Sequence, residues 1–175
     1  MTTVWHQDET WRYLYFSSDE AAPEVGPFGP LVDLWRAKCD GRRVPAWRDF
    51  DFFDFVGWHG YVTVYDVAYD PFDYVTRLSG TALDDLFGRT LKGLDRDGFN
   101  SFYLRHNRMD EFSEFCCRGL FGSYVEGPLN VQRREFIDVL YLELPLADDP
   151  VADRASHTIE VIIPAEERAK FPRRG

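Results

Sequence analysis

The sequence has few cysteines and no long apolar run. Of its 175 residues only Cys39, Cys116 and Cys117 are cysteine, and they form no C-x-x-C pair. An odd number without such a pair indicates reduced thiols rather than a disulfide framework. No run approaches the roughly 18 apolar residues of a membrane helix, and the first residues carry acids in place of the apolar stretch of a signal peptide. We therefore expect a cytoplasmic protein with no membrane partner.

Positive charge is also scarce. Twenty Lys and Arg residues stand against 30 Asp and Glu, which leaves a formal net charge of −10. Binding to a phosphate backbone requires clustered Lys and Arg, and an anionic membrane surface attracts the same residues. The composition therefore argues against a nucleic acid or a membrane surface as a partner.

Catalytic motifs are missing as well. The sequence contains no G-x-S-x-G, H-E-x-x-H, Walker loop or G-x-G-x-x-G. Asp84 and Asp85 are adjacent, so on a helix they would point about 100° apart and could not converge on one substrate. We expect no enzyme. The alternative, a small enzyme, would need a polar cleft in which carboxylates or histidines with perturbed pKa values converge.

Aromatic residues are abundant. They make up 17% of the chain, with 15 Phe, nine Tyr and five Trp. A single domain of this length can bury a real core. Rings in such number indicate either a core built on aromatic packing or a cavity lined by aromatic side chains.

Hydrophobic periodicity predicts an α+β domain. Helical spacing begins at Pro30, Thr81 and Met109, and the first of these helices should end near Gly41. Alternating or β-branched runs predict strands over residues 60–67, 73–80, 123–131, 135–146 and 157–163. The result is a five-stranded antiparallel sheet with helices on one face, preceded by a leading N-terminal helix.

The run DFDFFDFVGWHG, residues 49–60, alternates acids and rings. As a strand it loses phase at the adjacent phenylalanines, so two helical turns fit better. Its acids and its histidine flank the turn instead of converging, so we expect no metal site. This interpretation predicts that Phe52, Phe55 and Val56 are buried and that Asp51 and Asp54 are largely exposed.

Two segments carry a resemblance to a known family. LVDLWRAKCDGRRVPAWRDFD, residues 31–51, and VTRLSGTALDDLFGRTLKG, residues 75–93, resemble the bacterial, alphaproteobacterial-type single-domain PAS family, and RLSGTALDDLFGR is the most specific part. The resemblance covers residues 28–165. Residues 1–27 are then a lead-in, and residues 166–175 are a charged C-terminal tail.

The resemblance implies a regulatory sensor or protein-interaction module without an attached output domain, so a separate signalling protein is the expected partner. An unknown small molecule could bind between the sheet and the helices. The leading helix, with Leu31, Leu34 and Trp35, would pack either on its own sheet or against a second copy, and a homodimer is the expected state. The cavity would be lined by Tyr74, Thr76, Leu78, Phe87, Phe112, Cys116, Leu140 and Leu142.

No cofactor is expected. The flavin-binding PAS subclass carries its reactive cysteine in a GxNCRFLQ-type helix that this sequence lacks, and Cys116 fits an apolar helix face. A haem-binding sensor, which stays an alternative, would need an axial histidine. His106 has a solvated sequence context, and His157 fits a hydrogen-bonded core or edge histidine.

Two charged residues interrupt strands. Arg77 lies in mid-strand, where it could pair with Asp66 across the hairpin or serve as a polar anchor at a signalling surface. Asp138 shares the phase of Leu140 and Leu142, so it must be paired, exposed or in contact with a ligand.

Overall fold

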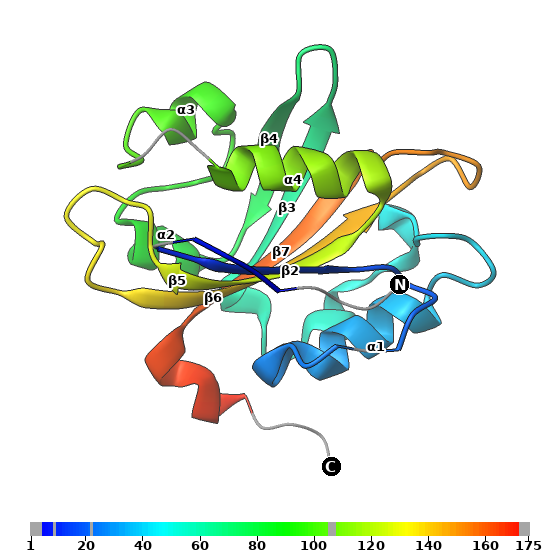
Figure 1. Cartoon of the computed structure of the whole chain (residues 1–175), viewed down its shortest axis with the longest axis horizontal. Helices are drawn as coiled ribbons and strands as arrows, with labels where there is room; N and C mark the ends of the chain where they lie inside the picture. The colour runs from blue at the N-terminus through cyan, green and yellow to red at the C-terminus, as the bar shows by residue number, and fades with distance from the viewer. Residues whose placement is uncertain (1–4, 9, 22, 105–107, 172–175) are drawn as a thin grey trace.

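The computed structural model describes residues 5–8, 10–21, 23–104 and 108–171. Its centre is a seven-stranded antiparallel sheet with the strand order β1-β2-β5-β6-β7-β3-β4 (Figure 1). The strands are β1 (Trp5–Gln7), β2 (Arg12–Phe16), β3 (Val62–Ala68), β4 (Asp73–Ser79), β5 (Gly122–Pro128), β6 (Asp138–Leu146) and β7 (His157–Pro164). The α+β class and the antiparallel sheet are confirmed. The predicted count of five strands is wrong, because β2 pairs with β5 and β1 extends the same edge.

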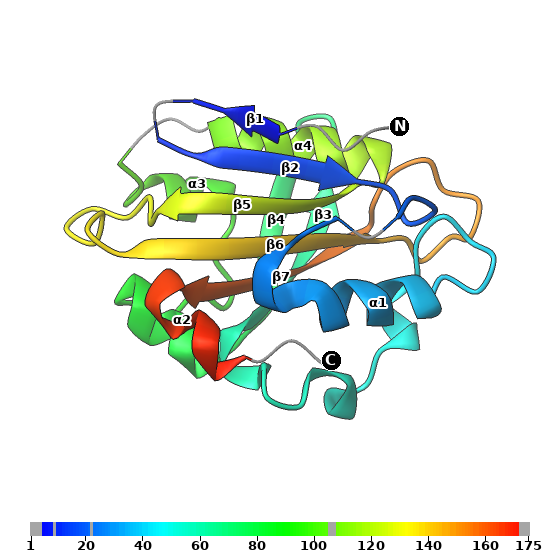
Figure 2. The same ribbon diagram turned by 60° about the horizontal axis from the view of Figure 1, so that its bottom comes forward.

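Helices cover both faces of the sheet. They are α1 (Gly29–Ala37), α2 (Thr81–Phe87), α3 (Arg96–Asn100) and α4 (Arg108–Gly119), with short 3-10 helices at Gly26–Phe28, Trp47–Asp49, Phe52–Phe55, His59–Tyr61 and Ala165–Lys170. Figure 2 shows α1 in front of the sheet and α4 behind it. Residues of α2, α3 and α4 share one core cluster and α1 packs in the other, so the middle helices lie on one face as expected and the leading helix covers the opposite face. The central strand β6 is apolar in both phases, as Leu142 and Tyr141 illustrate, so each face requires cover.

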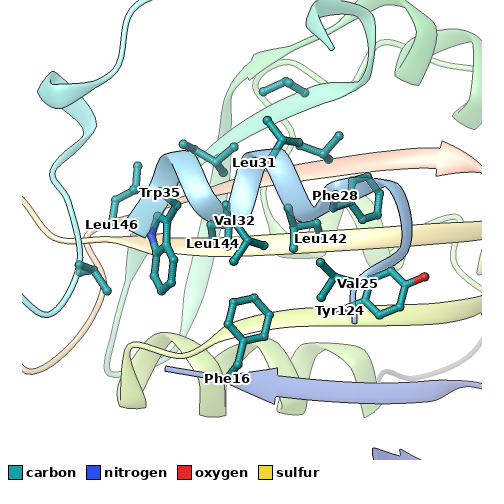
Figure 3. Close-up of a cluster of buried hydrophobic side chains, with 14 of the residues drawn as sticks. Phe16, Val25, Phe28, Leu31, Val32, Trp35, Tyr124, Leu142, Leu144 and Leu146 are labelled. Atoms are coloured by element: carbon teal, nitrogen blue, oxygen red, sulfur yellow. The ribbon is translucent and has the colours of Figure 1, made fainter. Parts of the chain in front are cut away.

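The leading helix α1 packs on its own sheet. Leu31, Val32 and Trp35 are buried and point toward the strands, as Figure 3 shows. The indole Nε1 of Trp35 donates a hydrogen bond of 3.0 Å to the carbonyl oxygen of Pro145 at the end of β6. Two of the three residues expected at a dimer interface are thus in the core, and Leu34 is partly buried.

The acid–aromatic run contains one complete 3-10 helix, Phe52–Phe55, and its two ends belong to the 3-10 helices Trp47–Asp49 and His59–Tyr61. The Asp51 carboxylate accepts hydrogen bonds from the backbone N–H groups of Phe53 and Asp54. The Asp54 carboxylate in turn accepts one from the backbone N–H of Asp51, which completes a capping box. Phe55 is 7% exposed, whereas Phe52 is 69% and Val56 66% exposed.

The prediction of burial is therefore wrong for Phe52 and Val56, because one short turn presents only its last ring to the core. Phe52 instead stacks on His59, with ring centroids 3.9 Å apart. Asp51 is exposed as predicted, but the Asp54 side chain is only 17% exposed because Lys38 Nζ lies 2.9 Å from its Oδ2.

The segment RLSGTALDDLFGR runs from the end of β4 through α2, and the structure explains why it contains glycine at two positions. A Cβ atom at Gly80 would collide with the backbone of His59 and Gly60, so only glycine permits this close approach. Gly88 ends α2 with a φ of 74°, the left-handed conformation common after a helix. Arg77 lies where the register of β3 and β4 shifts, and its Nε is 2.7 Å from Asp66 Oδ1, which confirms the predicted pairing.

Candidate functional site

A polar cavity of about 60 Å³ lies between the sheet and α4. Strands β3, β4, β6 and β7 supply one side of it, and α4 supplies Asp110, Ser113 and Cys117. The spacing of these three helical residues puts them on one face of α4. Five rings line the cavity: Tyr65, Phe72, Tyr74, Tyr103 and Tyr141.

Two glutamates from neighbouring strands face each other in this cavity. Glu143 of β6 is directly opposite Glu160 of β7 in the register. The Ser113 hydroxyl contacts both carboxylate oxygens of Glu143, at 2.9 and 3.1 Å, and the Tyr65 hydroxyl donates to Glu160 Oε1 at 3.0 Å. Like charges directly across a pair of strands destabilise a sheet, so this arrangement is costly when both groups are ionised.

The surroundings raise the pKa values of both glutamates well above the ordinary glutamate value. Desolvation is the largest cause for each, because protein encloses the two carboxyls even though they keep some surface toward the cavity. The charge of Glu143 raises the pKa of Glu160 further. Hydrogen bonds from Ser113 and Thr158 to Glu143, and from Tyr65 to Glu160, act in the opposite direction without cancelling the shift.

A third acid in the cavity, Asp110, is compensated. Its Oδ2 lies 3.0 Å from Arg96 Nε, and its Oδ1 accepts a hydrogen bond of 3.0 Å from the Tyr74 hydroxyl. Arg96 also donates to the carbonyl oxygen of Phe72. This network ties α3, α4 and β4 together beside the two glutamates.

Two phenol groups of the cavity are not hydrogen-bonded within the described part of the chain. Tyr141 is only 7% exposed, and neither its hydroxyl group nor that of Tyr103 has a hydrogen-bond partner among the described residues. Burial raises the pKa of both phenols, so each keeps its proton at neutral pH and can donate or accept a hydrogen bond. The cavity therefore combines acids, free hydroxyl groups and ring faces.

The residues expected to line a ligand cavity are scattered. Tyr74 does line it. Thr76, Phe87 and Cys116 are buried elsewhere in the core, Phe112 packs against the rings of Tyr13 and Tyr15, and Leu78 is 48% exposed on the edge strand. Leu140 and Leu142 belong to the core cluster beneath α1, on the opposite face of the sheet.

The alternation of side chains along a strand explains why Leu140 and Leu142 do not line the cavity. It also explains why sequence reasoning missed residues that do. Side chains of β6 alternate between the two faces, so Leu140 and Leu142 point toward α1 while Tyr141 and Glu143 point toward α4. The available signal was a single glutamate in each of two strands, β6 and β7, that are otherwise nearly apolar. A lone acid in a strand that is buried on both faces requires a partner or a function.

The other expected features lie away from the cavity. His157 is hydrogen-bonded on both sides, with Nδ1 2.8 Å from Asp66 and Nε2 2.7 Å from Asp148, as a satisfied histidine should be. Asp138 is exposed at the start of β6. The haem candidate His106 lies outside the described residues. Within the described ranges, no helix is long and apolar enough to cross a membrane, and no group of three His, Cys, Asp or Glu side chains could hold a metal ion.

The three cysteines are free and buried, and burial raises the pKa of each thiol. None of them is an activated nucleophile, since activation requires a lowered pKa.

No protein-family model, no curated protein and no solved structure matches this chain. The chemistry of the cavity is therefore the main basis for a functional proposal. The glutamate pair can hold protons at a pH where ordinary glutamates are ionised, and it can accept hydrogen bonds from a cationic ligand. Both properties fit a binding site, and the first also fits acid–base chemistry.

Proposed function

We propose that this protein is a cytoplasmic regulatory sensor module of the PAS type, which binds a small molecule between its sheet and α4 and signals through a separate protein. The observation that carries the proposal is the polar cavity with its opposed pair of glutamates. A further support is the chain order, in which a hairpin, β3–β4, precedes the helices and three strands, β5 to β7, follow them. The three free cysteines fit a reducing compartment.

The cavity contacts suggest how occupancy is transmitted. Ser113 connects Glu143 to α4, and the Asp110–Arg96 pair connects α4 to α3. A ligand that changes the charge or the hydrogen bonds of the glutamates changes the restraints on both helices. The helices α3 and α4 are then the elements that respond, and their outer surface is where a signalling partner would detect the change.

The test is native mass spectrometry of the protein purified from its own host, combined with a matched pair of variants. Cys117→Met places extra volume in the cavity, whereas Cys116→Met places the same volume in core that does not line it. We expect a bound small molecule on the wild type and on Cys116→Met, and none on Cys117→Met. Equal occupancy of both variants, or a wild type that carries and binds no small molecule, contradicts the sensor proposal.

The proposed homodimer is separate from the cavity. Leu31 and Trp35 are buried against the chain's own sheet, so a dimer that uses α1 would have to use its outer face, where Leu34 is partly exposed. Light scattering at high micromolar concentration tests this point. A clean monomer contradicts the dimer and leaves the sensor proposal untouched.

A second candidate function is supported by the same glutamates. Two opposed carboxyls with raised pKa values beside protonated phenols form an arrangement in which one group could take a proton while another gives one. An enzyme of this kind would act on a very small substrate. Chemical conversion of the molecule released from the cavity, abolished by Glu143→Gln or Glu160→Gln, would favour the enzyme. Stoichiometric binding without conversion favours the sensor.

A further inference from the structure

The cavity contains more negative than positive groups. Of the three acids that line it, only Asp110 has a cationic partner within the described part of the chain, and that partner is Arg96. Among the described lining residues none is Lys, Arg or His, and the hydrogen bonds to Glu143 and Glu160 come from neutral hydroxyl groups. The pair therefore holds protons, or a ligand that carries positive charge must neutralise it.

Rings surround the two glutamates. Tyr65 and Tyr74 meet edge to face, with centroids 5.4 Å apart, and the Phe72 and Tyr74 rings are 6.2 Å apart. The face of an aromatic ring attracts a cation through its quadrupole, and clustered rings are how proteins bind alkylated ammonium groups. Rings together with carboxylates suit an ion that has both methyl groups and N–H donors, whereas a bare metal ion would require more oxygen ligands.

A hydroxyl group next to the pair, on the buried residue Tyr141, has no hydrogen-bond partner among the residues that the structure describes. Tyr141 precedes Glu143 by two residues on β6, so both side chains point to the same face of the sheet. Tyr141 lines the cavity, is more than nine-tenths buried, and makes no side-chain hydrogen bond to another described residue. A buried polar group in this state requires a water molecule or a ligand as its partner.

The size of the cavity restricts the ligand. One water molecule needs about 10–15 Å³ of such space. The cavity of about 60 Å³ thus has room for about four non-hydrogen atoms. Metabolites of ordinary size, and planar cofactors such as haem or flavin, exceed this volume.

We propose that the cavity binds a small alkylammonium ion, from methylammonium to trimethylammonium, between Glu143, Glu160 and the surrounding rings. The proposal rests on the sensor function above and names the class of its ligand. Each ammonium N–H group, of which methylammonium has three and trimethylammonium one, donates to a glutamate oxygen or to the Tyr141 hydroxyl, and the methyl groups lie against the rings. A cation that binds while the pair holds a proton displaces that proton into solvent, so charge balances.

The test is calorimetry and thermal unfolding of the full chain with methylammonium, dimethylammonium and trimethylammonium chloride. We expect saturable binding, no tighter than roughly 50 µM for ions of this size, and a rise in Tm. Sodium chloride at equal ionic strength and tetraethylammonium, which is too large, should give neither. At pH 6, measurements in two buffers of different ionisation enthalpy should show release of a proton. Equal effects of sodium and methylammonium overturn the proposal.

Variants separate this role from a structural one. The double variant Glu143→Gln/Glu160→Gln keeps shape and hydrogen-bonding capacity, and should bind methylammonium at least ten-fold more weakly and release no proton. Tyr141→Phe, which removes one hydroxyl group, should weaken binding several-fold, and the exposed control Glu135→Gln should not change it. Unchanged affinity in the double variant overturns the proposal.

Failure of the ammonium proposal can be distinguished from failure of the sensor proposal. If native mass spectrometry finds a neutral or anionic molecule that Cys117→Met excludes, the ammonium proposal is wrong and the sensor proposal stands. If neither that experiment nor the ammonium series detects any ligand, both are wrong.

Discussion

Replacing the buried glutamates should make the protein more stable at neutral pH. Glu143 and Glu160 have raised pKa values in the folded state, first because they are desolvated. In the unfolded chain each ionises at the ordinary glutamate value, near 4.3. Above that pH the folded state therefore binds more protons than the unfolded state, and the free energy of unfolding falls as pH rises.

The slope gives the magnitude. Each proton that the folded state retains costs about 1.4 kcal/mol of stability per pH unit. Between pH 5.0 and 6.5 one retained proton thus costs about 2 kcal/mol, and two cost about 4 kcal/mol. Glutamine resembles the protonated carboxyl and does not ionise. The Glu143→Gln/Glu160→Gln variant should match the wild type near pH 4.5 and exceed it by about 2–4 kcal/mol at pH 6.5.

Urea denaturation at several pH values between 4.5 and 7 measures this difference, with Glu135→Gln as an exposed control. Asp49, Asp54 and Glu167 have lowered pKa values, so the stability they contribute is lost only as pH falls below the ordinary pKa values of Asp and Glu. They therefore do not affect the comparison between pH 4.5 and 7. A difference between wild type and double variant that stays constant with pH would refute the reasoning. It would mean that both glutamates are ionised and solvated in the folded protein.

Three further predictions concern other parts of the molecule. Phe55→Ala should cost about 3–5 kcal/mol in urea denaturation, and Phe52→Ala less than about 1 kcal/mol, because only Phe55 is buried; equal costs would contradict the packing described here. Arg77→Ala should cost less than about 1 kcal/mol because its pair with Asp66 is half-exposed, and a larger loss would indicate a role beyond that pair. Cys116 and Cys117 should resist a thiol reagent until the protein unfolds, since burial raises both pKa values; fast labelling of the native protein would contradict their burial.

Local sequence signals predicted the elements well and the layers less well. The spacing of Leu31 and Trp35 identified the buried face of α1, and the residues of the β3–β4 hairpin fit the observed strands closely. Strands β1 and β2 lie in the lead-in, where β2 gains its pairing only from β5, more than 100 residues away. Neither segment alone specifies a partner strand at that distance. The cover that α1 gives the second face follows from strands that are apolar in both phases, whereas the shared face of the middle helices was predicted correctly.

The cavity was harder to predict for a different reason. A strand pattern shows which residues share a face, but the choice between Leu140 and Tyr141 as cavity residues depends on where α4 packs. Glu143 and Glu160 converge because their strands pair in one particular register, which nothing in either strand specifies alone. By contrast, the pairing of Arg77 with Asp66 could be predicted, since the two residues belong to one hairpin.

The two faces of the sheet differ in character: one carries an apolar core and the other the polar cavity. The face toward α1 is an apolar core that includes Trp35 and Leu142. The face toward α4 keeps two opposed acids that lower stability at neutral pH, and a Tyr141 hydroxyl without a hydrogen-bond partner in the described ranges. Gln and Phe, of nearly the same shape, would avoid both costs. A fold that needed these groups only for packing would be more stable without them. The proposed cationic ligand would offset their cost, and so the α4 face is the place to look for function.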